Sequence, residues 1–483
     1  MKKRYWIIIF FSIFFILNSC FLGKREEVVS DKRIIRIAFF GNLLHRNPHF
    51  ATDLSSTFLL YPLYHSLFTY DESGKIVKDL VKEYFWKNHL TLILKIRKSF
   101  HYTDGERITE KQVMENLKYF SNPQRNFPFS SEYGFIKKIK VYGNSIIINL
   151  KYPFSPVLSY LTIPIVQEKF LGDDSKFPFS SKGFEILSYK RGRSFTIKKK
   201  EKLIKFIFVK DKMTALLKLK KGEVDLIAGY KFRQRINDSN ILQKRYKINM
   251  LYYLVFNLKD KRLRDIFLRK KIKECLDFSA IVEAFKGDVY YSEYPVLISG
   301  FFEEGEYNVK EKGWKKFQQS VFNGPPFSIL INSESGVKRL YATIIKEQLK
   351  TCGIEVKIIS LEYASYLKRL KGGAFEMAIG GYVFDSDPNQ RDIWHSKGAV
   401  NYAGLDDESV NLLIEKGIKE INFSVRKKIY TTLYSKLMKK IPLIFLPTPY
   451  FKVYYRKNLK IRIPSLLHSN SSLFQYIDNW EKF

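Results

Sequence analysis

Residues 90–113 constrain the fold more than any other stretch, because they indicate a strand, a turn and a helix in succession. Apolar side chains alternate with other residues from Leu90 to Ile96, the period of a strand with at least one buried face. Asp104-Gly105 predicts a turn, and Thr109 stands where a helix N-cap belongs, ahead of an apolar-periodic segment. This succession indicates a mixed α/β chain and by itself identifies no particular protein class.

Length and charge set broad limits. A chain of 483 residues, 45% of them hydrophobic, is long enough for two or three domains with buried cores. Its formal net charge of +35 is typical of proteins that bind nucleic acid or anionic surfaces. The basic residues, however, are spread in short clusters such as 198–200, 269–271 and 426–428. We therefore expect a solvated basic surface, with polyanion or anionic-lipid binding as the alternative.

The N-terminus is typical of an export signal. A positive segment at Lys2–Arg4 precedes the apolar run from Trp6 to Leu17. The closing residues Leu17–Cys20 resemble a bacterial lipobox, which implies a signal peptide at 1–19 and lipidation of Cys20. Lipidation would anchor the protein in the bilayer, with 20–33 as a tether. The alternative is an ordinary signal peptide, or an uncleaved anchor, that ends at a chance cysteine.

Two cysteines remain in the body of the chain. Cys275 and Cys352 are separated by 77 positions, and each lies in a predicted helix or at a helix end. An exported protein can form a disulfide, but one pair of cysteines gives no framework pattern. We predict two separate buried thiols, with pairing left open.

Residues 97–113 closely resemble the signature of family 5 solute-binding proteins, the oligopeptide- and dipeptide-binding components of ABC importers. That signature runs roughly F-x-L-R-x-G-V-x-F-x-D-G-x-x-L-T-A-x-D-V. Ser99, Glu110 and Gln112 depart from it by replacing Gly, Ala and Asp. The spacing is kept without a gap at Arg97-Lys98, Phe100, Tyr102, Asp104-Gly105, Ile108-Thr109 and Val113.

Further segments resemble the family more loosely. Residues 221–225 are similar to its G-E-V-D turn, and Phe256-Asn257 to the strand that crosses into the second lobe. Arg269, Ile272 and Asp277 keep part of the family's R-x-A-x-x-x-A-I-D-R helix pattern, and its alanines are lost. At residues 180–184 the family pattern is Gly-Thr-Gly-Pro-Tyr, whereas this chain has Ser-Ser-Lys-Gly-Phe and keeps only the aromatic position.

The resemblance implies a fold. It is an α/β, two-lobed periplasmic-binding-protein-like fold (class II, cluster C type), with an extra α+β domain inserted in the first lobe. The lobes would enclose the ligand by closing about a hinge. Independently, the strand, helix and strand from Phe327 to Ile359 form a βαβ unit, which predicts a parallel pair. The predicted division is lobe I at 34–55, 160–255 and 450–483, the inserted domain at 56–159, and lobe II at 256–449.

The candidate binding residues lie after a predicted strand at 375–380. The segment from Gly381 to Pro388 is similar to the family's G-W-x-A-D-Y-x-D-P, with Tyr and Ser in place of Trp and Tyr. The resemblance implies that Asp385 holds the α-ammonium group of a peptide, and it makes Tyr382 and Asn257 further ligand-binding candidates. The alternative is that the two aspartates and the proline only build a turn.

Motifs for catalysis or metal binding are missing from the sequence. H-E-x-x-H, G-x-S-x-G, Walker and G-x-G-x-x-G patterns do not occur. His45, His49 and Asp53 are spaced like ligands on one helix face, but Pro48 argues against that helix. We expect no enzyme, no cofactor and no metal site.

The resemblance finally implies a function. It is that of a membrane-anchored substrate-binding lipoprotein, facing the periplasm or cell exterior, which captures short peptides for an ABC permease complex in the inner membrane. The expected partners are the peptide, the permease and, through Cys20, the lipid bilayer, with no nucleic acid and with the protein as a monomer. Two alternatives stay open. One is a different solute, such as a metal chelate, haem or an oligosaccharide. The other is a surface adhesin that binds polyanions.

Overall fold

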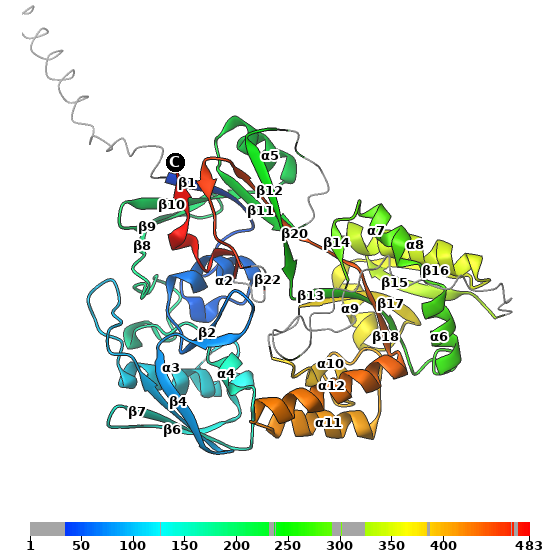
Figure 1. Ribbon diagram of the computed structural model, residues 1–483, viewed down its shortest axis with the longest axis horizontal. Helices are drawn as coiled ribbons and strands as arrows, with labels where there is room; N and C mark the ends of the chain where they lie inside the picture. Colours follow the sequence, from blue (N-terminus) through cyan, green and yellow to red (C-terminus); the bar gives the residue numbers. More distant parts are fainter. Residues whose placement is uncertain are drawn as a thin grey trace, which may run out of the picture.

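The chain forms two bodies, which we call the first and the second lobe (Figure 1). The structure is a computed structural model, and it describes residues 34–125, 127–230, 236, 238–291, 301, 324–383, 387–464, 466–467 and 472–483. The signal peptide, Cys20, the tether and Asp385 therefore lie outside the described residues. Among the residues that are described, no helix is both long and apolar enough to cross a bilayer.

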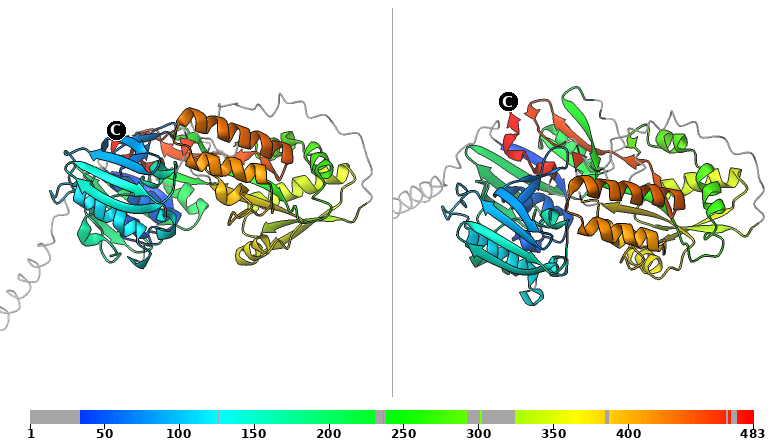
Figure 2. Two further views of the ribbon diagram at one scale, coloured as in Figure 1. Left: turned by 90° about the horizontal axis from the view of Figure 1, so that it is seen from below. Right: turned by 60° about the horizontal axis from the view of Figure 1, so that its bottom comes forward.

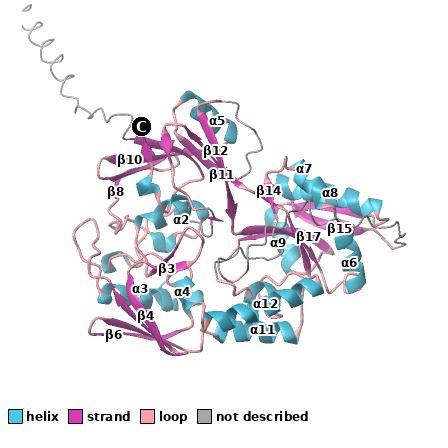
Figure 3. Cartoon of the chain, in the orientation of Figure 1, coloured by secondary structure: helices cyan, strands magenta, loops and turns pink. Residues whose placement is uncertain are grey.

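The first lobe is built on an eight-stranded mixed sheet (Figure 3). Its central strands β1, β10 and β11 are parallel, and β20 runs antiparallel between β11 and β12. Four of the seven side chains of β1 are buried, with Ile37, Ala38 and Phe39 buried in succession, as expected for a central strand that is covered on both faces. In sheet order the strands are β22 (Leu466–Leu467), β12 (Ile241–Ile248), β20 (Phe451–Arg456), β11 (Leu226–Tyr230), β1 (Ile34–Phe40), β10 (Lys202–Val209), β9 (Ser194–Lys199) and β8 (Glu185–Lys190).

Between β1 and β10 the chain builds a second, four-stranded antiparallel sheet. The predicted strand and helix of 90–113 are confirmed, because Thr109 caps the helix in a reciprocal capping box with Gln112. The elements of this region are α2 (Leu54–Leu60), β2 (Phe68–Tyr70), β3 (Ile76–Lys78), β4 (Val81–Asn88), β5 (Thr91–Ile96), α3 (Glu110–Ser121), β6 (Ile136–Tyr142), β7 (Ser145–Leu150) and α4 (Val157–Tyr160). Helix α5 (Lys212–Lys221) then joins β10 to β11.

The second lobe is built on a five-stranded sheet with helices on both faces. The predicted βαβ unit is confirmed, since β15 and β16 are parallel and α8 connects them. In sheet order the strands are β16 (Val356–Leu361), β15 (Phe327–Asn332), β17 (Met377–Val383), β13 (Met250–Phe256) and β18 (Leu443–Leu446). The helices are α6 (Ile266–Glu274), α7 (Phe278–Ala284), α8 (Gly336–Thr351), α9 (Tyr363–Lys371), α10 (Arg391–Trp394), α11 (Glu408–Lys419) and α12 (Phe423–Lys440).

The chain passes between the lobes where β12 runs into β13 and where β18 leads back to β20 (Figure 1). Strand β13 pairs along its whole length with β17, so the second lobe's sheet begins at Met250. The predicted division had placed the boundary between residues 255 and 256. Beside the crossing, β14 (Val289–Tyr290) pairs with β19 (Thr448–Pro449). At the chain end, β21 (Leu459–Lys460) pairs with β23 (Glu481–Lys482).

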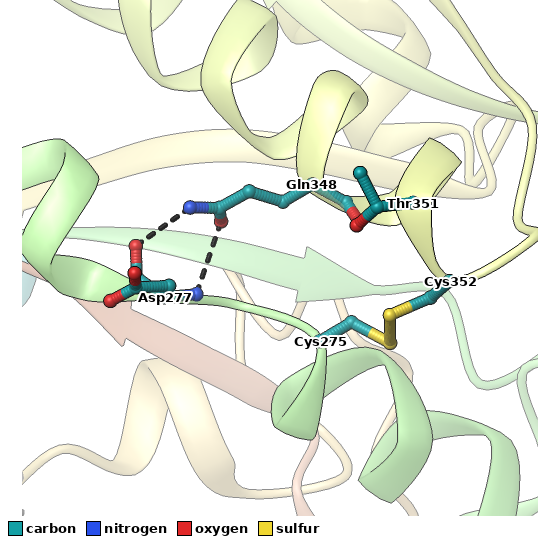
Figure 4. Close-up of a disulfide and its surroundings, with 5 residues drawn as sticks. All are labelled: Cys275, Asp277, Gln348, Thr351 and Cys352. Carbon is teal, nitrogen blue, oxygen red and sulfur yellow. Dashed lines mark hydrogen bonds between the residues drawn. A yellow bond between two sulfur atoms is a disulfide. The ribbon is translucent and has the colours of Figure 1, made fainter. Parts of the chain in front are cut away.

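The expectation of two separate thiols is wrong, because Cys275 and Cys352 form a disulfide (Figure 4). Each cysteine caps the end of a helix, α6 and α8, and their Cα atoms lie 6.3 Å apart. Beside the bond, the Asp277 N–H donates to the Gln348 side chain at 3.2 Å, and the Gln348 amide donates to the Asp277 carbonyl at 2.7 Å. The pairing could not be predicted from the sequence, because the two cysteines are 77 positions apart and their proximity depends on how the helices pack.

Candidate functional site

The carboxyl ends of the strands in the two lobes face the same crossing. In the second lobe β15, β16, β17 and β18 run in one direction and end at the edge where β13 enters. In the first lobe β1, β10, β11 and β12 also run in one direction and end where β12 leaves for β13. Ligands of open α/β sheets bind outside the carboxyl ends of the strands. The region between the two edges is therefore the candidate site.

Polar side chains brace the crossing. The Tyr290 hydroxyl lies 2.6 Å from the carbonyl oxygen of Ile248 and accepts from the N–H of the same residue at 3.3 Å. Asp288, at the start of this segment, pairs with Lys452 and lies 3.6 Å from the guanidinium of Arg245. Both basic residues belong to the first lobe's sheet, on β20 and β12. The contacts hold the segment at 288–290 against both crossing strands.

On the second lobe, Tyr382 is half-buried next to the end of β17. Burial raises the pKa of the neighbouring Tyr253, and the nearby Tyr366, Tyr402 and Tyr382 raise it further, so Tyr253 is neutral. A Cβ at Gly380 would collide with the Tyr253 ring, which explains the glycine at this position of β17. Tyr253 and Tyr366 are buried, and the Tyr366 hydroxyl donates to the Ile379 carbonyl at 2.9 Å, so Tyr382 is the half-buried tyrosine at the end of β17.

Asp387, the first described residue after Asp385, is held in place by an ion pair. The guanidinium of Arg426 on α12 donates to both oxygens of the Asp387 carboxylate, at 2.6 and 2.7 Å, and both side chains are under 10% exposed. Burial alone would lower the pKa of Arg426, but the charge of Asp387 outweighs it and raises the pKa above the ordinary value. Asp387 thus has a structural role, and Asp385, outside the described residues, keeps its ligand role as a prediction.

Asn257 lies away from the other candidates. It follows the far end of β13, at the opposite sheet edge from Tyr382, about 20 Å along the strand. Its side-chain amide donates to the carbonyls of Gly373 and Phe375, at 3.0 and 2.7 Å, and its oxygen accepts from the Lys259 N–H at 3.1 Å. These bonds close a turn at the edge of the sheet. The structure therefore does not bring Asn257 together with Tyr382.

The first lobe contributes a cavity of about 320 Å³, which the sequence analysis did not predict. Hydroxyl-bearing and aromatic side chains dominate its wall, one lysine joins them, and no aspartate or glutamate lines it. The residues are Ala51, Thr52, Thr57, Tyr61, Pro62, Tyr64, Ser66, Thr69, Tyr70, Phe129, Thr162, Pro164, Lys182 and Gln475. Its volume lies at the lower end of the range for small-molecule sites. The only signal in the sequence was Lys182, which departs from the family pattern.

A buried carboxylate lies behind this cavity. Asp79 accepts from the N–H of Ser66 at 2.9 Å, and its other oxygen lies 2.7 Å from His65 Nδ1. Burial raises the pKa of Asp79, but the hydrogen bond with His65 and the positive charge of Lys182 outweigh it and hold that pKa below the ordinary value. The wall of the cavity therefore has a stable negative charge beneath it.

The lobes touch each other at Ser155. Its N–H donates to the carbonyl of Ile418 at 2.7 Å and its hydroxyl to that of Gly417 at 3.1 Å, both at the end of α11. Figures 1 and 2 show α11 and α12 reaching the first lobe beside α4. The Gly417 carbonyl also accepts from Nε of Arg426 at 2.9 Å. The Gly417 carbonyl therefore accepts hydrogen bonds both from Ser155, across the contact between the lobes, and from Arg426, which pairs with Asp387.

The histidine-rich segment before α2 does not form one site. His45 Nδ1 lies 2.8 Å from Asp174, whereas Nε2 of the fully buried His49 lies 2.8 Å from the Pro164 carbonyl. Asp53 caps α2 by accepting from Ser56. Among the described residues, no group of three or more His, Cys, Asp or Glu side chains could hold a metal ion.

Comparison with protein families gives one match over most of the chain. Residues 75–404 match the model described as bacterial extracellular solute-binding proteins, family 5 middle. The oligopeptide-binding protein AppA of Bacillus subtilis is 23% identical over 519 residues, covering 93% of this chain and 94% of AppA. The nickel-binding protein NikA of Staphylococcus aureus is 20% identical over 412 residues, covering 78% of this chain and 81% of NikA.

Solved structures have the same fold. NikZ from Campylobacter jejuni, in complex with Ni(L-His), has a TM-score of 0.72 at 20% identity, covering 93% of this chain and all of NikZ. Bacillus subtilis AppA, in complex with a nonapeptide, has a TM-score of 0.69 at 20% identity, covering 93% and 99%. CtaP of Listeria monocytogenes has a TM-score of 0.78 at 18% identity, covering 91% and 97%. The two-lobed fold expected from the sequence is therefore confirmed.

Proposed function

The chain belongs to the bacterial extracellular solute-binding proteins of family 5, and we propose that this solute-binding protein of an ABC importer captures short peptides between its two lobes. The observation that carries the proposal is that the carboxyl edges of both sheets meet at one crossing. One edge offers the half-buried Tyr382, and the first lobe offers a cavity rich in hydroxyl groups. Such neutral groups suit the repeated amides of an extended peptide.

The comparison with AppA supports a peptide as the solute. That protein is named for oligopeptide binding, and its similarity extends over nearly the whole of both chains. The described part of this chain also offers no cluster of side chains suited to a bare metal ion. A direct test is calorimetric titration of the full chain, purified in a mild detergent, with random peptide libraries of fixed length. Saturable binding of peptides supports the proposal, and its absence at every length from two to nine contradicts it.

Within this proposal Asp385 binds the α-ammonium group of the peptide. It lies in the three residues that join the end of β17 to the anchored Asp387. Because a charge-assisted hydrogen bond contributes about 1.5–3 kcal/mol, Asp385→Asn should weaken peptide binding by about 10- to 150-fold. N-acetylated peptides should bind weakly to both proteins, and the exposed Asp392→Asn serves as the matched control. Unchanged affinity for free peptides in Asp385→Asn would contradict the assignment.

We also propose that Cys20 anchors the protein to a membrane facing the periplasm or the cell exterior, where it delivers its solute to an ABC permease. The support is the order of charged, apolar and Leu-Asn-Ser-Cys segments at the N-terminus. Growth with radiolabelled palmitate should label the protein, and Cys20→Ser should abolish the label. A labelled Cys20→Ser protein would contradict the anchor.

A nickel chelate is the second candidate solute. The similarity to NikA and to NikZ, which was solved with Ni(L-His), favours it. A chelate brings its own metal ligands and so does not need a cluster of them on the protein. Titration with nickel and histidine together separates the two candidates. Saturable binding of the chelate, without binding of peptides, would replace the peptide proposal.

A further inference from the structure

The cavity of the first lobe has one charged side chain in its wall, that of Lys182. The hydroxyl groups of Thr52, Tyr61 and Thr69 share this wall, and their side chains make no hydrogen bond among the described residues. A positive charge beside free hydroxyl donors is the surrounding that a carboxylate requires. The lining residues include no carboxylate that would repel such a group.

The backbone holds Lys182 at the cavity. Its N–H donates to the carbonyl of Leu63 at 3.1 Å and contacts the Ser180 hydroxyl at 3.2 Å. The Ser180 hydroxyl donates to the same carbonyl at 2.5 Å, and the Ser181 hydroxyl accepts from the N–H of His65 at 2.6 Å. The loop that carries Lys182 is thereby fixed to the segment at 61–66, which forms part of the cavity wall.

The ammonium group of Lys182 is available for a ligand. Among the described residues the Lys182 ammonium group forms no ion pair, although its positive charge lowers the pKa of the nearby Asp79 carboxylate. That carboxylate is already engaged by His65 and Ser66. Asp79 therefore balances part of the positive charge from behind the wall without closing an ion pair.

Lys182 is also a particular feature of this chain. In the Gly-Thr-Gly-Pro-Tyr pattern that residues 180–184 resemble, the third position is a glycine, and here it is Lys182. The substitution adds a long cationic side chain to the cavity wall where the pattern has no side chain. The serines at the first two positions form the hydrogen bonds that hold the loop.

We propose that Lys182 binds a carboxylate of the solute in the cavity of the first lobe, which for a peptide is its C-terminal carboxylate. This inference rests on the proposed capture of peptides and adds a chemical requirement to it. Solutes with a free carboxylate bind well, and the same solutes with that group converted to an amide bind poorly, because the amide leaves the ammonium group unpaired.

The test compares two random pentapeptide libraries, one with free C-terminal acids and one with C-terminal amides. The full chain is purified in a mild detergent, and bound peptide is measured by competition calorimetry for the wild type and Lys182→Gln. We expect the wild type to prefer the acids about tenfold or more. Lys182→Gln should lose that preference by binding the acids more weakly and the amides as before.

Two further variants separate a direct contact from a structural effect. Lys182→Arg keeps the charge and should retain most of the preference for acids. Lys190→Gln removes an exposed charge elsewhere in the first lobe and should behave as the wild type. Equal weakening of acids and amides in Lys182→Gln would overturn the proposal, as would a wild type that binds both libraries equally. A wild type that binds neither library contradicts the peptide proposal itself.

Discussion

The two sides of the candidate site are held in place by different interactions. In the second lobe a buried ion pair with Arg426 holds Asp387 in place. In the first lobe uncharged hydrogen bonds fix the loop that lines the cavity: the Ser180 hydroxyl donates to the Leu63 carbonyl, and the Ser181 hydroxyl accepts from the His65 N–H. A buried charge without its partner is far more costly than a lost neutral hydrogen bond. Damage to the second lobe should therefore reduce stability most, whereas damage to the first lobe should change recognition more than stability.

The largest effect is expected for Arg426→Met. The substitution leaves the buried Asp387 carboxylate without its ion-pair partner, although it still accepts from the Asn389 N–H, and this should lower the free energy of unfolding by about 3–5 kcal/mol. Denaturant unfolding measures the change. The double variant with Asp387→Asn removes the orphaned charge and should recover part of the loss. Equal stability of the single and double variants would show that the ion pair does not hold Asp387 in place.

The next effect concerns the disulfide of the second lobe. Replacing both Cys275 and Cys352 by serine opens a loop of 77 residues, and loop entropy predicts a loss of about 4.5 kcal/mol of stability. Reduction of the wild type with dithiothreitol should give the same loss, and dithiothreitol should leave the double-serine variant unchanged. Affinity for peptide should be kept under native conditions, because the disulfide lies away from the crossing. A wild type equally stable in both redox states would contradict this prediction.

In the first lobe the expected effect depends on pH. Burial lowers the pKa of His49 from 6.5 to about 4, although its bond to Pro164 opposes the shift. Between these values the unfolded chain binds a proton that the folded protein does not. The stability contributed by neutral His49 is therefore full above pH 6.5 and falls as the pH drops toward 4, by about 3 kcal/mol in all.

Unfolding by urea at a series of pH values measures this effect. His49→Gln keeps a donor for the Pro164 carbonyl and removes the titration, so its stability should fall less between pH 6.5 and 4. Parallel pH profiles of the two proteins would contradict the role of His49.

The smallest effect is expected at the contact between the lobes. Ser155→Ala removes the hydrogen bond to the Gly417 carbonyl and keeps the backbone bond to Ile418. A loss of about 1 kcal/mol should speed peptide release by about fivefold, because the contact that holds the two lobes together is weaker. Stopped-flow dissociation measures the rate. Ser159→Ala, which removes a bond within the first lobe, should leave the rate unchanged, and equal rates in all three proteins would contradict a closing role.

Much of the fold followed from local patterns. Alternation and the capping signal predicted β5 and α3, and periodicity predicted the β15–α8–β16 unit, because these features depend on residues near each other in sequence. The bidentate partner of Asp387 lies 39 positions away, and the cavity combines segments from residue 51 to residue 475. The disulfide likewise depends on how two helices pack. Contacts between residues far apart in the sequence depend on tertiary packing, which no local sequence pattern predicts.

The most direct test of the central claim is native mass spectrometry of the full chain, purified in a mild detergent from cells grown on a rich peptide source. Capture of short peptides between the lobes predicts a ladder of small adducts that fragment as di- to pentapeptides. A single uniform adduct that contains nickel, or any other non-peptide solute, would contradict the claim.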